Sequence, residues 1–203
     1  LSLICMVANV LCRRYVYGKV MSKIEKTLMD IEDSLLKAEA SYQLWWTIVG
    51  EGMSQHKNAL DKLAHVDFFH ASIPIFLQSI FLNLSKIFDR AEDLSGMRSL
   101  KKSLLENGKD GAVYKIDFIL NRNKNYIISI KGIRDQSIGH RKTHKTVEQI
   151  YNENEITPDQ IKLLIEDIKT IVKIASGTIG RKYDLLDSNR YADATISLIK
   201  SIE

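Results

Sequence analysis

The feature that most constrains the fold is a run of apolar residues at helical spacing between Ile73 and Asp89. Apolar side chains recur there at steps of three and four, and polar side chains take the opposite face, which is the pattern of an amphipathic α-helix. The apolar stripe consists of Ile73, Phe76, Leu77, Ile80, Phe81, Leu84, Ile87 and Phe88. Pro74 is expected in the first turn, where its missing backbone N–H is not needed.

Other segments show the same period. Helical patterns cover residues 22–49, 95–106, 112–140 and 193–202, and the third is either one helix or two joined near residues 121–125. A further helix begins at Thr157, because Thr caps, Pro158 takes the first helical position and Gln160 can close a capping box. With only 2 Pro and 10 Gly, few helices are forced to break. The sequence therefore predicts an all-α bundle of five or six helices.

The chain has 203 residues, which we interpret as one domain over residues 21–203 preceded by an extension at 1–20. The apolar start LSLICMVANVLC is too short to span a bilayer, which takes about 20 residues. As a signal peptide its polarity is reversed, since Arg13 and Arg14 follow the apolar run. We favour a non-native or upstream extension over a membrane anchor. With 2 cysteines a disulfide framework is excluded, so a cytoplasmic protein is expected.

Charge is local. The net charge of +4 owes three units to residues 1–20, so the remaining chain is nearly neutral. Between Val113 and Val147, however, two Asp stand against eight bases, namely Lys115, Arg122, Lys124, Lys131, Arg134, Arg141, Lys142 and Lys145. Such a local excess attracts phosphates.

The candidate chemistry lies within that basic stretch. Arg134 is followed directly by Asp135, and His140 stands six positions after the arginine. On an ideal helix this spacing puts Arg134 and His140 about 120° apart, so both can border one groove. Gly139 weakens the helix just before His140. The plainer interpretations are a surface Arg–Asp ion pair and a histidine stabilised by the helix dipole.

In this arrangement the chain resembles the HEPN superfamily of helical domains, and within it the abortive-infection branch that acts in phage defence. The residues that carry the resemblance extend from about Lys23 to Ala175 and comprise Trp45-Trp46, Ile87-Phe88-Asp89, Arg134-Asp135 with His140-Arg141, and the helix that starts at Thr157. The resemblance implies a HEPN-like bundle. It also implies a metal-independent endoribonuclease toxin that cuts single-stranded RNA as a homodimer.

On this interpretation Arg134, Asp135 and His140 are catalytic. The following residues contact RNA: Arg141, Lys142, His144 and Lys145. His140 and His144 have the spacing of a metal pair, but no nearby carboxylate or cysteine completes it, so no metal and no cofactor are expected. An antitoxin is a possible further partner, and no membrane is involved. The alternative is a non-catalytic HEPN-like module that binds RNA, nucleotide or a protein.

Overall fold

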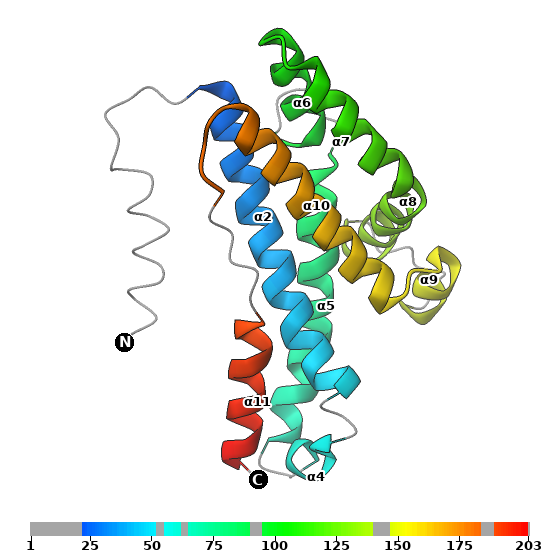
Figure 1. Cartoon of the computed structure of the whole chain (residues 1–203). Helices are drawn as coiled ribbons and strands as arrows, with labels where there is room; N and C mark the ends of the chain where they lie inside the picture. The colour runs from blue at the N-terminus through cyan, green and yellow to red at the C-terminus, as the bar shows by residue number, and fades with distance from the viewer. Residues whose placement is uncertain are drawn as a thin grey trace.

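The computed structural model describes residues 22–51, 55–61, 65–89, 95–139, 147–183 and 189–202, and every statement below refers to these ranges. Their regular elements are all helices, so the predicted all-α class is confirmed. The three longest are α2 (Lys23–Trp46), α5 (Val66–Ile87) and α10 (Pro158–Thr178). Figure 1 shows α2 and α5 side by side, with α10 crossing them diagonally. The predicted extension at 1–20 lies outside the described residues.

The helix α2 begins at a capping box. The Ser22 hydroxyl accepts from the Glu25 backbone N–H, and the Glu25 carboxylate accepts from the Ser22 N–H. Its buried face consists mainly of Ile24, Leu28, Ile31, Leu35, Ala38 and Tyr42. At its other end α2 is followed directly by a π-helical turn, η1 (Thr47–Glu51). The helical conformation therefore extends past residue 49, where the predicted pattern ends. A Cβ at Gly50 would stand 2.7 Å from the Trp46 ring, so this close turn requires glycine.

The helix α5 starts seven residues earlier than the sequence predicted. Pro74 therefore lies inside the helix and not in its first turn. It cannot donate to the carbonyl of His70, and because both residues are exposed, water can satisfy that carbonyl. Within the part of the chain that the structure describes, α5 is the one helix long and apolar enough to cross a membrane. Here it packs along α2 in the main core.

The segment predicted as helical over 112–140 contains two helices, which is the second of the two predicted alternatives. After α6 (Met97–Glu106), the chain forms α7 (Asp110–Arg122) and α8 (Lys124–Ile133), which meet at Asn123. The Asn123 side chain is buried, donating to the Ile119 carbonyl at 2.9 Å and to Asp167 on α10 at 2.6 Å. Arg122 also pairs with Asp167, so one buried carboxylate fixes the α7–α8 joint against α10.

The remaining elements close the two ends of the bundle. The box at the start of α10 is present as predicted, with Thr157 and Gln160 bonded reciprocally. A short helix that was not predicted, α9 (Val147–Asn154), precedes it. At the far end, α4 (Lys57–Leu60) and α11 (Arg190–Ile202) cover a second, smaller core. That core contains Ile48, Ala59, Leu60, Phe69 and Ile199.

Candidate functional site

The predicted arginine lies where α8 ends and a second π-helical turn, η2 (Arg134–Gly139), begins. This turn contacts both α5 and α9. The side chain of Ser137 donates to the Ile133 carbonyl at 2.6 Å within it, and Gln136 has a buried side-chain oxygen without a hydrogen-bond partner. Residues Arg134–Gly139 therefore do not follow the rotation per residue of an ideal α-helix, because a π turn has i→i+5 bonds. Such turns are frequent at functional sites.

Two carboxylates from different elements approach the Arg134 guanidinium. Asp135 Oδ1 lies 2.7 Å from its Nε, and Asp89 Oδ2 lies 3.7 Å from Nη1. The Nε group still has no hydrogen-bond partner, so its N–H does not point at the Asp135 oxygen and the contact is an ion pair without an aligned hydrogen bond. About a quarter of the Arg134 side chain is exposed, at 27%.

This geometry holds the arginine between two carboxylates. Asp89 stands just after α5, so the end of a core helix holds a residue that follows α8. The sequence named Asp89 through the family resemblance alone, and the structure brings it to Arg134. The Nε atom is buried, and an arginine guanidinium is a planar group of donors that suits an anionic ligand. Within the described part of the chain, no three His, Cys, Asp or Glu side chains are grouped to hold a metal ion.

A close approach between helices supports this corner of the molecule. A Cβ at Gly132, two residues before Arg134, would clash with the Asn154 side-chain oxygen of α9. Asn154 is itself held by a bond to the Ile150 carbonyl at 2.7 Å. Glycine at this position thus lets α9 close directly on α8.

The other predicted site residues lie in the segment 140–146, outside the described residues. They are His140, Arg141, Lys142, His144 and Lys145. The turn η2 ends at Gly139, the residue before His140. The tryptophans Trp45 and Trp46 pack partly buried against the main core, with ring centroids 5.6 Å apart.

A buried polar network that the sequence did not predict lies between α2, α10 and α11. The Lys169 ammonium is 2.6 Å from Glu39 and 3.0 Å from Glu166, and only 8% of its side chain is exposed. Burial alone lowers the pKa of Lys169, but the hydrogen bonds to Glu39 and Glu166 outweigh burial and raise it above the ordinary lysine value. These groups line a hollow of about 410 Å³.

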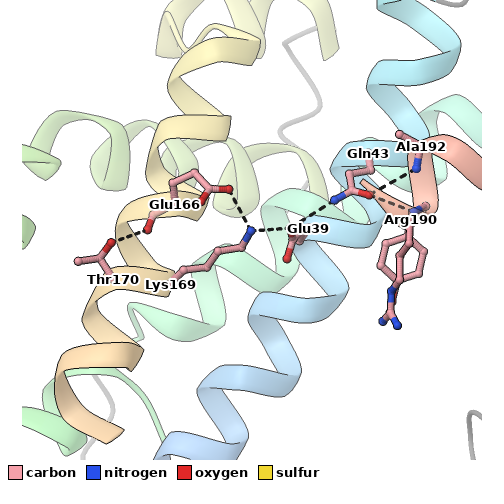
Figure 2. Close-up of polar contacts among 8 residues, drawn as sticks. Glu39, Gln43, Glu166, Lys169, Thr170, Arg190 and Ala192 are labelled. Carbon is pink, nitrogen blue, oxygen red and sulfur yellow. Dashed lines mark hydrogen bonds and ion pairs between the residues drawn. The ribbon is translucent and has the colours of Figure 1, made fainter. Parts of the chain in front are cut away.

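The network extends to the start of α11. Gln43 donates to Glu39 at 3.3 Å, and its side-chain oxygen accepts from the backbone N–H groups of Tyr191 and Ala192 at 3.1 and 3.4 Å (Figure 2). A side chain of α2 thereby caps the first turn of α11. The hydroxyl of Tyr42, on the same wall, is buried without a partner, and burial raises its pKa to about 12.

An all-α bundle in which an Arg–Asp pair follows an apolar helix and faces a carboxylate from a second core helix has the features of a HEPN domain. Comparison with known families agrees, because the family model HEPN_AbiU2, described as AbiU2, matches residues 21–195. The chain belongs to this AbiU2 family of HEPN domains, an abortive-infection family that acts in phage defence. No curated protein and no solved structure matches the chain.

Proposed function

We propose that this protein is a metal-independent endoribonuclease toxin that acts in abortive infection, in the cytoplasm, as a homodimer with one composite cleft. The observation that carries the proposal is Arg134, held between Asp89 and Asp135, directly upstream of the segment that contains His140. Family membership supports it, since the matching family model covers residues 21–195 and therefore includes the Arg134 motif. An antitoxin encoded with such a toxin is a further expected partner.

The proposed reaction uses the RNA's own 2′-hydroxyl. The imidazole of His140 takes the proton from that hydroxyl, because histidine exchanges protons near neutral pH. The 2′ oxygen attacks phosphorus, and the bond between phosphorus and the 5′ oxygen breaks. The leaving 5′ oxygen takes a proton from the Arg134–His140 motif of the second copy of the chain. Arg134 stabilises the charge that develops on the phosphoryl oxygens. The products are a 2′,3′-cyclic phosphate and a 5′-hydroxyl.

The test is cleavage of single-stranded RNA by purified protein with excess EDTA. We expect the wild type to cleave and His140→Ala to be inactive while keeping its fold and dimer. Arg134→Lys should lose at least about tenfold in rate, because a point-charge ammonium cannot replace the planar guanidinium. Arg98→Lys, on α6, is the matched control.

Three results would contradict the proposal. Equal cleavage by wild type and His140→Ala would show that the activity belongs to another site or to a contaminant. If the wild type cleaves no RNA and its expression does not slow growth, the chain is instead a non-catalytic binding module. A product lacking the cyclic phosphate would refute the proposed nucleophile.

A further inference from the structure

Two aromatic rings project from α7 into solvent. Tyr114 is 76% exposed and Phe118 65%, the highest values among the exposed large hydrophobic residues of the described chain. At 100° per residue, positions four apart lie about 40° from one another, so the rings are neighbours on one face. Relative to the buried Ile116, both lie about 160° away, on the opposite side of the helix. Neither ring contributes to the core, and together they form an apolar surface that a ligand can cover.

A cationic hollow lies beside these rings, between the start of α7 and the later part of α10. It has a volume of about 460 Å³, and three lysines line it, namely Lys109, Lys115 and Lys173. Its other lining residues are Gly111, Ala112, Ile174, Gly177 and Thr178, so no acidic side chain is among them. Such a hollow attracts anions.

The three lysines differ from the other cations nearby. Lys101 pairs with Asp117, and Arg122 pairs with Asp167, whereas no described carboxylate forms an ion pair with Lys109, Lys115 or Lys173. Asp110, in the first turn of α7, is exposed and does not line the hollow. The α7 N-terminus also lacks a side-chain cap, which adds positive partial charge at this edge.

The alternation of aromatic rings and lysines on this face suits the bases and phosphates of a single-stranded nucleic acid. Lys115 follows Tyr114 directly and lies about 60° from Phe118 around the helix axis, so a cation flanks each ring. Bases stack on exposed aromatic rings, while lysines hold the phosphates that run beside them. An apolar protein surface would cover the rings but leave three positive charges without counterions.

We infer that α7 is a single-stranded RNA platform, on which Tyr114 and Phe118 stack bases and Lys109, Lys115 and Lys173 hold phosphates. The inference rests on the proposed function in one respect only, that RNA is the ligand. Phe118 and Arg134 are sixteen positions apart, which at about 1.5 Å per residue sets a separation of roughly 24 Å or less. One RNA strand can therefore contact both the α7 platform and Arg134. None of the platform residues belongs to the segment 140–146 that the sequence predicted as the RNA contact.

The test measures binding in the His140→Ala background, so that the RNA stays intact. A fluorescently labelled single-stranded RNA of mixed sequence is titrated with full-length protein, and anisotropy is followed at several salt concentrations. Replacing Tyr114 and Phe118 together by Ala should weaken binding at least about tenfold, since both base-stacking contacts are lost. Replacing Lys109, Lys115 and Lys173 together by Ala should reduce the slope of log K against log salt by about 2.

Matched controls come from other faces of the molecule. Phe68 on α5 is 61% exposed, so Phe68→Ala removes a comparable ring and should leave binding unchanged. Lys26, Lys86 and Lys200 are likewise exposed lysines, and replacing all three by Ala should change the salt slope by much less than 2. Thermal unfolding of each variant verifies the fold.

The outcomes separate the platform from the proposed enzyme. If the platform variants bind RNA as the control variants do while the wild type still cleaves, the inference is overturned and the proposed function stands. If RNA binding depends on the platform but the wild type never cleaves, the platform stands and the ribonuclease does not. Absence of any RNA binding, or dimer dissociation as the only effect of the ring variant, also overturns the platform.

Discussion

At the scale of single residues, the buried Lys169–Glu39 ion pair is expected to contribute strongly to the free energy of unfolding. Both side chains are at most 10% exposed, so neither charge can be hydrated when its partner is removed. We expect Lys169→Met to lower the free energy of unfolding by about 3–5 kcal/mol, because a buried carboxylate is left without its cation. Denaturant unfolding measures this loss.

The matched control is Lys37→Met on α2. Lys37 pairs with Asp33 at the same 2.6 Å, but both side chains are about half exposed, so the expected loss is below about 1 kcal/mol. A second change, Glu39→Gln in the Lys169→Met protein, should recover part of the stability. Equal losses for Lys169→Met and Lys37→Met would show that the Glu39 carboxylate is effectively hydrated.

At the scale of elements, the Gln43 side chain caps the start of α11 and contributes to the local stability of that helix. Its side-chain oxygen accepts from two backbone N–H groups in the first turn of α11. Gln43→Ala should remove this cap and cost about 1 kcal/mol of local stability. Amide hydrogens of α11 should then exchange about fivefold faster, while those of α6 keep their rates. Gln78→Ala, at an exposed position of α5, is the control, and unchanged exchange in α11 would contradict the capping role.

The sequence predicted well those helix ends whose geometry depends on residues that are neighbours in the chain. The start of α10 depends on Thr157, Pro158 and Gln160, which are neighbours in the chain, and its geometry is as expected. The start of α5 was placed too late, because Pro74 looked like a first-turn residue and the stretch before it has no clear apolar period. The helix α9 has only 8 residues, which is too short to show a clear apolar period, so the sequence did not predict it.

Long-range features of the site were beyond local sequence patterns. Glu39 and Lys169 are 130 positions apart, and nothing near either residue indicates that they pair. Asp89 was named through the family resemblance, but its approach to Arg134 depends on how α5 packs against η2. Likewise, Gly132 gave no sign that Asn154 would close on it.

At the scale of the whole molecule, burial of several titratable groups predicts a loss of stability at alkaline pH. Burial raises the pKa of Tyr42 to about 12, with a smaller effect from Asp159, and burial raises the pKa of Tyr151 to about 12. Burial lowers the pKa of Lys169, but its hydrogen bonds to Glu39 and Glu166 outweigh burial and raise it. For a group whose pKa is higher in the folded state, the stabilisation is complete below the unfolded pKa and is lost as pH rises through the folded pKa.

The expected window for this loss is therefore pH 10 to 12. Each buried tyrosine should reduce the free energy of unfolding by on the order of 1 kcal/mol at pH 11, since the unfolded chain ionises first. Urea unfolding at pH 8, 9, 10 and 11 tests the sign. Tyr42→Phe should flatten the decline, and at pH 8 it should cost little, because the Tyr42 hydroxyl has no hydrogen-bond partner. Tyr114→Phe, at an exposed ring, should leave the slope unchanged, and a free energy of unfolding that stays constant to pH 11 would refute the prediction.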